Sequence, residues 1–190
     1  EVEFYRPKAN KVVHCTVCPF DCHLFEGEMC RCRTRTNVGG KLLTPAWNNP
    51  CILRIDPVEK MPLNHFLPGE ETIFIAVGGC MLRCLYCQNW QQSQQQPQKL
   101  KTFDCDAGTA VAGVRAQAKA RENDPEAKRC RAIAFTYTEP GASLEYVKAV
   151  CERARAEGVH TALASAMFYN EHVMRDICRW TDGIAAALKG

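Results

Sequence analysis

The sequence predicts an α/β fold with a parallel sheet in residues 70–190, preceded by a cysteine-rich, loop-rich segment in residues 1–69. Two observations lead to this prediction. After residue 70, short apolar runs alternate with amphipathic stretches, which is typical of β/α units joined by right-handed crossovers. Before residue 70, clustered cysteines and frequent prolines and glycines interrupt the apolar runs. We therefore expect a cysteine-rich segment with a wrapping connector (1–69) and a β/α part (70–190).

The composition is that of an ordinary globular protein, with 46% hydrophobic residues, 24% charged residues and a formal net charge of +3. No basic run marks a surface for nucleic acid or an anionic membrane. No apolar stretch is long enough to cross a bilayer. We therefore expect a soluble, cytoplasmic protein without nucleic-acid or membrane partners. The chain begins at Glu1 rather than at Met, which suggests that it is part of a longer gene product.

The chain contains 13 cysteines, and the first group is Cys15, Cys18, Cys22 and Cys32. The count is odd and many cysteines stand two or three residues apart, which favours metal ligation in a reducing compartment over a disulfide scaffold. Four thiolates can close a zinc site or hold an iron–sulfur cluster, and the spacing does not choose between them. Cys30 is a candidate substitute ligand, although its place two residues from Cys32 makes simultaneous ligation awkward.

Residues 41–69 are expected to wrap the larger part as a connector, because proline disrupts long regular elements. The prolines of this stretch are Pro45, Pro50, Pro57, Pro62 and Pro68. His65 lies in the same stretch and, taken alone, would be an ordinary hydrogen-bonded loop histidine.

Four strands and three helices are expected in the β/α part. The strands are expected at 70–79, 131–137, 160–165 and 183–188. The first helix should begin at Asp104 or Asp106 and run to about Arg121. The second should be capped by Ser143 and end before Gly158, and the third should begin at Asn170. Since parallel strands present functional groups at their carboxyl ends, the segments that follow these strands should share one rim.

Three cysteines follow the first expected strand in the spacing C-x3-C-x2-C: Cys80, Cys84 and Cys87. A closed zinc site takes four protein ligands and an ordinary iron–sulfur cubane takes four thiolates. A three-thiolate loop therefore leaves one metal position open for a small chelating molecule. The residues Thr138-Glu139 and Ser165-Ala166 also follow strand ends, so they should lie on the same rim as this loop.

Four ordered motifs resemble those of the radical S-adenosylmethionine (radical SAM) superfamily, and in particular the radical SAM protein of the AmmeMemoRadiSam system, related to pyruvate formate-lyase activating enzymes. The resemblance covers roughly Cys15 to Lys189. The motifs are Cys-Pro-x2-Cys with the later Gly27 and Cys32, the stretch 56–69, the three-cysteine loop with Tyr86 and the following Gln88-Asn89-Trp90, and the stretch 135–140.

This resemblance implies an enzyme in which Cys80, Cys84 and Cys87 hold a 4Fe-4S cluster whose open iron binds SAM. Reductive cleavage of SAM would give a 5′-deoxyadenosyl radical that abstracts hydrogen from an unknown substrate, a protein glycine being one candidate. A reductant such as flavodoxin or ferredoxin is implied. Residues expected at the cofactor are Tyr86 near the adenine, Thr138 and Glu139 near the SAM amino group, and also Asn89 and Ser165. His65 becomes a candidate site residue.

The resemblance also implies a partial, truncated radical SAM β/α barrel, because superfamily barrels usually have six strands. About four are expected here, which would expose a sheet edge. We expect a fragment, with a partner subunit or self-pairing as alternatives. Two strand-end motifs depart from the pattern: Ser165-Ala166-Met167 replaces Thr-Asn-Gly, and Ala187-Leu188-Lys189 replaces Asp-Leu-Lys. Cys30 stands where the pattern has glycine.

Two other functions remain open from the residues alone. One is an iron–sulfur electron-transfer or cluster-carrying module that also uses Cys15, Cys18, Cys22 and Cys32 and does not cleave SAM. The other is a zinc-stapled binding protein without redox chemistry. For Glu139 the alternative role is a helix-entry acid favoured by the helix dipole, and for Tyr86 it is loop packing. The sequence identifies neither the substrate nor its catalytic residues.

Overall fold

A five-stranded sheet forms the centre of the larger part in the computed structural model, which describes residues 1–122, 124 and 126–189. Its strands, in spatial order, are β10 (Gly183–Ala186), β9 (His160–Ser165), β8 (Cys130–Phe135), β7 (Glu71–Ala76) and β6 (Ile52–Pro57). Strands β7 to β10 run parallel to one another, whereas β6 pairs with β7 in the antiparallel sense. The expected α/β class and the four parallel strands are therefore confirmed.

Strand β6 corrects the expectation that residues 41–69 form only an irregular connector. Ile52 to Pro57 pair with β7 over six positions, from Ile52 opposite Ala76 to Pro57 opposite Glu71. Pro57 is tolerated because β6 is an edge strand and Pro57 is its last residue. The β7 edge, which a four-strand sheet would have exposed, is therefore covered. Within the described residues the sheet is open, with β6 and β10 at its edges.

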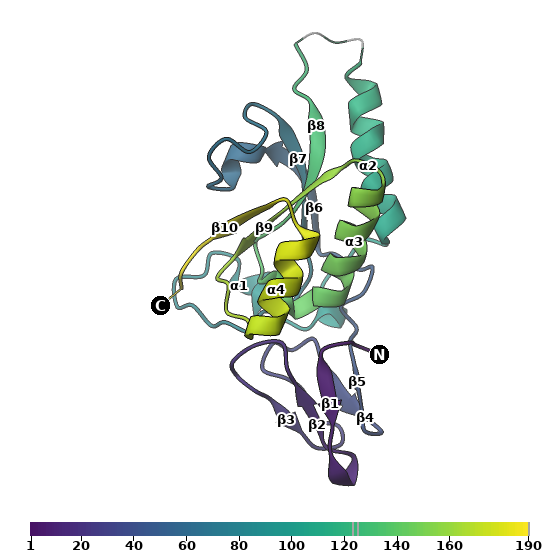
Figure 1. Cartoon of the computed structure of the whole chain (residues 1–190), viewed down its shortest axis with the longest axis vertical. Coiled ribbons are helices and arrows are strands. Elements are labelled where there is room, and N and C mark those ends of the chain that lie inside the picture. The colour runs from purple at the N-terminus through teal and green to yellow at the C-terminus, as the bar shows by residue number, and fades with distance from the viewer. Residues whose placement is uncertain (123, 125, 190) are drawn as a thin grey trace.

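Three helices cover one face of this sheet (Figure 1). They are α2 (Ala107–Ala120), α3 (Leu144–Ala156) and α4 (Glu171–Trp180). Alternating strand residues such as Ile73, Ile133 and Leu163 belong to the core cluster that these helices share. The residues between them in the strands face the other side, where Phe74 and Ala134 form a second cluster with Met61 of the connector. The period-two pattern of the strands thus separates a helix-covered face from a connector-covered face.

The helix boundaries lie at the expected residues, although Ser143 and Asn170 precede α3 and α4 without a side-chain capping bond. Asp106 caps α2, because its Oδ1 accepts a hydrogen bond from the Thr109 backbone at 2.7 Å. Gly158 lies just beyond α3 in the left-handed region with φ +70°, as expected of a C-terminal glycine. Ser143 precedes α3 but makes no capping bond, since a short 3-10 turn (Pro140–Ser143) leads into the helix.

The N-terminal segment is built from short antiparallel strands and lies against the end of the sheet (Figure 1). Strands β1 (Tyr5–Pro7), β2 (Val13–Cys15) and β3 (His23–Leu24) form one sheet, and β4 (Thr36–Val38) and β5 (Lys41–Leu43) form a hairpin. The remaining short elements are the 3-10 turns Ala9–Lys11, Val58–Lys60 and Pro97–Lys99 and the helix α1 (Trp90–Ser93). No helix among the described residues has both the length and the apolar character needed to cross a membrane.

Candidate metal and cofactor site

A cavity of about 260 Å³ lies at the carboxyl ends of the parallel strands. The three-cysteine loop follows β7, and the segments after β8, β9 and β10 supply the other walls. Its lining includes Cys80, Cys84, Cys87, Asn89, Thr138, Glu139, Ser165, Ala166, Ala187 and Lys189. The segments that the sequence assigns to one rim therefore line one cavity.

The cysteine loop is held in place by its own backbone and by the N-terminal segment. Cys80 is buried, whereas Cys84 and Cys87 are partly exposed. The Cys80 backbone N–H donates to the Cys32 carbonyl at 3.1 Å, and Leu82 N–H donates to Cys80 Sγ at 3.4 Å. Burial raises the pKa of the Cys80 thiol to about 11. A metal bound there would have to displace this thiol's proton.

The number of thiols at the cavity bears on which metal group they fit. Cys80, Cys84 and Cys87 line the cavity together and give it three thiols. A closed structural zinc site takes four protein ligands, whereas a cubane held by three thiolates keeps one iron without a protein ligand. The three thiols fit such a cubane.

Glu139 is the buried acid of the cavity, and three groups hold it. Its Oε1 accepts from the hydroxyls of Ser165 and Tyr169, and its Oε2 accepts from the Ala166 backbone N–H at 2.9 Å. Burial raises the pKa of the Glu139 carboxyl above its usual value, against the hydrogen bonds from Ser165 and Tyr169. Glu139 is therefore a fixed acceptor that joins the ends of β8 and β9.

Of the other residues expected at the cofactor, some line the cavity and some do not. Asn89 lines the cavity, and Thr138 does so while its hydroxyl donates to the Val77 carbonyl at 2.8 Å. The Tyr86 side chain is 64% exposed. Tyr86 and His65 are not among the lining residues, and His65 is exposed.

Sequence reasoning missed several residues of this site, among them Tyr169 and Lys60. Tyr169 donates to Glu139 from the segment after β9, and Lys60 reaches the cavity from the connector. The apolar run around Tyr169 carries no sign of this contact. Lys60 had a weak signal, because it belongs to the motif 56–69 that the resemblance singled out.

The N-terminal cysteines form a second group of thiols. Cys15, Cys18, Cys22, Cys30 and Cys32 surround one small closed space. Interaction with the Cys30 thiol lowers the pKa of both Cys22 and Cys32 to about 6. Cys30 lines the same space as the four expected ligands, so the group has five thiols instead of four. All thirteen cysteines of the chain are free thiols.

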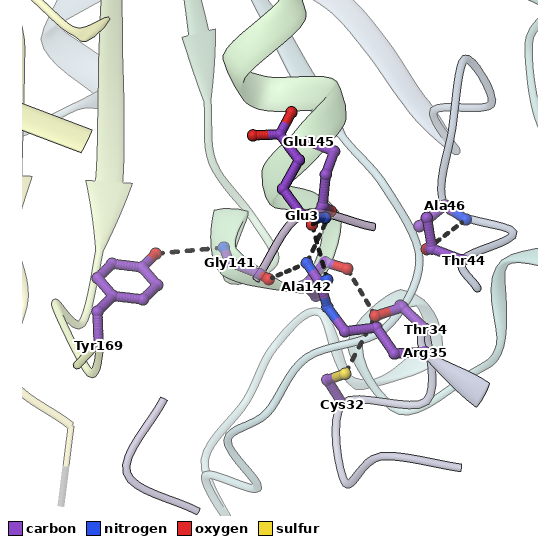
Figure 2. A network of polar contacts seen from close by, with 10 residues as sticks. All are labelled: Glu3, Cys32, Thr34, Arg35, Thr44, Ala46, Gly141, Ala142, Glu145 and Tyr169. Carbon is purple, nitrogen blue, oxygen red and sulfur yellow. Dashed lines mark hydrogen bonds and ion pairs between the residues drawn. The ribbon is translucent and has the colours of Figure 1, made fainter. Parts of the chain in front are cut away.

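A buried ion pair joins Arg35, close to this second group in the chain, to Glu145 of α3 (Figure 2). The Arg35 guanidinium donates to both Glu145 carboxylate oxygens at 2.8 Å, and its side chain is 1% exposed. Thr34 Oγ1 lies 3.1 Å from Cys32 Sγ and donates to the Ala142 carbonyl at 2.5 Å. Ala142 belongs to the 3-10 turn Pro140–Ser143, and Gly141 N–H of the same turn donates to the Tyr169 hydroxyl at 3.2 Å. These contacts therefore connect Cys32 to Tyr169, which donates to Glu139 of the cavity.

The fold and the cavity define an α/β protein with a cysteine-lined site at the carboxyl end of its sheet. No family model matches the chain. Over 163 residues the chain is 34% identical to a protein of Methanocaldococcus jannaschii that bears the name Uncharacterized protein MJ0808. The matched region covers 86% of this chain and 46% of that relative. The chain thus matches less than half of the relative's length.

Proposed function

We propose that the chain is the SAM-binding part of a radical SAM enzyme of the activating-enzyme type. One observation carries the proposal: Cys80, Cys84 and Cys87 line the same cavity as Glu139 and Ser165. Thiolates that can hold a cluster and a carboxylate that can bind an ammonium group thus face a common space. The ordered motifs of the sequence support the same function.

The donor set fits a 4Fe-4S cluster with one iron free of protein ligands. Three thiols line the cavity, one fewer than the four protein ligands of a closed zinc site or an ordinary cubane. A cluster and SAM bound here would supply, after one-electron reduction, a 5′-deoxyadenosyl radical that abstracts hydrogen from the substrate.

Glu139 is the residue proposed to receive the SAM ammonium group. An ionised carboxylate offers about four lone-pair sites, and the three donors Ser165, Tyr169 and Ala166 N–H leave one of them free. Because the Ala166 contact uses the backbone, it survives the absence of the asparagine side chain that the related enzymes have there. Ala187 places a methyl group in the cavity where those enzymes have an aspartate, so a cation site there is not part of the proposal.

The larger part is proposed to be a partial radical SAM barrel. Four parallel strands with helices on one face and the site at their carboxyl ends support this assignment. The proposed partners are SAM, a one-electron donor such as flavodoxin or ferredoxin, and a protein substrate. The second group of thiols is proposed to hold a further cluster or zinc.

An iron–sulfur electron-transfer module is the second candidate function. It is favoured by the direct hydrogen bond between the Cys32 carbonyl and the Cys80 backbone N–H, which brings the two groups of thiols together. Such a module would carry two clusters and would not respond to SAM.

The experiment is anaerobic reconstitution of the full chain with iron and sulfide, followed by dithionite and SAM. The proposal expects 5′-deoxyadenosine, detected by chromatography, and its loss in the Cys84→Ser variant. Protein that holds the cluster and forms no 5′-deoxyadenosine would contradict SAM cleavage by this chain. Cluster spectra that are indifferent to SAM would favour the electron-transfer module.

A further inference from the structure

We propose that His14, Asp21 and His23 form a binding site for a divalent transition metal ion such as Zn²⁺. Among the described residues, this is the group of three potential ligand side chains whose ligand atoms all lie within 4.8 Å of one another. It shares no residue with either group of cysteines. The inference is independent of the proposed SAM chemistry.

Strand pairing brings the two imidazoles together. His14 and His23 are direct partners in the antiparallel pair of β2 and β3. Their rings are stacked, with centroids 4.2 Å apart and an interplanar angle of 10°. The neighbouring residues Cys15 and Leu24 are buried, so the alternation of the strands directs the imidazoles to the opposite face of the hairpin. This places them on the face away from the buried thiol of Cys15.

The ring nitrogens of His14 and His23 have different partners. His23 Nδ1 lies 3.0 Å from the Asp21 carbonyl oxygen. When Nδ1 donates to that carbonyl, Nε2 keeps its lone pair, and a backbone acceptor behind the ring is the usual support of a metal-binding histidine. His14 Nε2 contacts the Asp21 carboxylate, while its Nδ1 is buried without a partner. His14 Nε2 thus lies beside the carboxylate of the proposed site. The two stacked rings would have to tilt apart for both Nε2 lone pairs, which lie in the ring planes, to meet at one ion.

The donor chemistry selects the class of metal. Two imidazoles and one carboxylate suit Zn²⁺ and neighbouring divalent ions, with a water in the fourth position. Bonds of about 2.0–2.2 Å in a tetrahedral arrangement place the ligand atoms about 3.4 Å apart. Asp21 and His23 are exposed side chains, so they can close by the remaining distance.

A metal at this position would tie the turn to both strands of the hairpin. The same hairpin carries two of the N-terminal thiols, and Cys15 N–H donates to the Cys22 carbonyl at 2.9 Å. The metal would therefore stabilise the backbone that holds Cys15 and Cys22, without binding either sulfur.

The test is a Co²⁺ titration of the full chain whose thiol sites have first been filled by anaerobic reconstitution. Co²⁺ bound by nitrogen and oxygen gives weak visible bands, whereas thiolate ligation adds intense near-ultraviolet charge transfer. We expect one additional Co²⁺ per chain with the weak bands alone. The His23→Gln variant should lower its affinity by about tenfold to a hundredfold, and Zn²⁺ should displace the bound Co²⁺.

Two further variants serve as a control outside the proposed site and as a second test within it. His172→Gln removes an exposed histidine of α4, outside the proposed site, and should leave Co²⁺ binding unchanged. Asp21→Asn keeps the shape of the turn and should weaken binding, so it decides the question if His23→Gln does not fold. Equal Co²⁺ affinity in the parent chain and Asp21→Asn, or binding that shows only thiolate charge transfer, would overturn the proposal. The three side chains would then be an ion pair and a ring stack that close the hairpin.

Discussion

Gly79 directly precedes Cys80 and lies against the N-terminal segment. Its φ is +93°, and a Cβ atom there would lie 2.4 Å from Thr34 Cγ2 and 2.6 Å from the Cys32 carbonyl oxygen. Glycine is required both by the left-handed conformation and by the approach of the N-terminal segment. The position of Cys80 therefore depends on a neighbour that lacks a side chain.

Gly79→Ala should lower the free energy of unfolding by about 3 kcal/mol or more, because backbone strain and overpacking add. Gly27→Ala is the matched control, since Gly27 also has a positive φ of +80°, but a Cβ atom added there would meet no other atom within 4 Å. The control should cost only about 1–2 kcal/mol. Urea unfolding under reducing conditions measures both. Equal losses would show that Cys32 and Thr34 do not crowd the loop.

Glu139 is the residue that the proposed cofactor contact depends on most. Glu139→Gln removes the charge that would bind an ammonium group, so SAM affinity of the reconstituted protein should fall about tenfold to a hundredfold. Tyr169→Phe removes a neighbouring donor but keeps the carboxylate, and it should change SAM affinity by about threefold or less while costing about 1 kcal/mol of stability. Anaerobic equilibrium binding of SAM to the two variants measures this difference. A larger effect for Tyr169→Phe than for Glu139→Gln would contradict the assignment of Glu139.

At the scale of elements, the contact between α3 and the N-terminal segment depends on the Arg35–Glu145 pair. Burial opposes ionisation of Glu145, but the charge and hydrogen bonds of Arg35 outweigh it, so the pKa of Glu145 is lowered. Removing one partner leaves the other charge buried and unpaired. This pair therefore makes docking of the N-terminal segment depend on both charges being present.

Arg35→Met should destabilise the protein by about 3–5 kcal/mol, because it strands the Glu145 carboxylate. The double variant Arg35→Met/Glu145→Leu should recover much of this loss, since no buried charge remains. The free energies of unfolding of the parent, both single variants and the double variant form the required cycle. A double variant that is as unstable as the sum of the single variants would contradict the coupling.

The same pair makes a pH-dependent contribution to stability. Because the folded-state pKa of Glu145 lies below its ordinary value of 4.5, the contribution is present above pH 4.5 and is lost as the pH falls through the lower folded-state value. The stability difference between the parent chain and Glu145→Gln should thus shrink below pH 4.5. Unfolding curves between pH 7 and pH 4 measure it, and a constant difference would argue against an ionised Glu145.

The elements show what local pattern can predict. The four parallel strands and three helices were predictable, because their apolar periodicity and flanking residues such as Asp106 and Gly158 are local signals. Strand β6 was not, because its boundary prolines disfavour a strand unless its edge position is known. The Arg35–Glu145 pair and the Tyr169–Glu139 contact join residues 110 and 30 positions apart. Such pairings arise from tertiary packing and produce no periodic pattern in the sequence.

At the scale of the whole molecule, the N-terminal segment closes one end of the sheet and the parallel strands open onto the cavity at that same end. Cys80, Cys84 and Cys87 were predictable as a group from their spacing, and their rim from strand polarity. The approach of Lys60 to the cavity was not, because it depends on how the connector folds back. The site is therefore a product of both parts of the chain.

The most direct test of the central claim is electron paramagnetic resonance of the reduced, reconstituted full chain with and without SAM. A cluster held by Cys80, Cys84 and Cys87 with an open iron should give a spectrum that shifts when SAM is added. The shift should be absent in Cys84→Ser, while any signal from the N-terminal thiols should remain. A reduced cluster whose spectrum is the same with and without SAM would contradict the account.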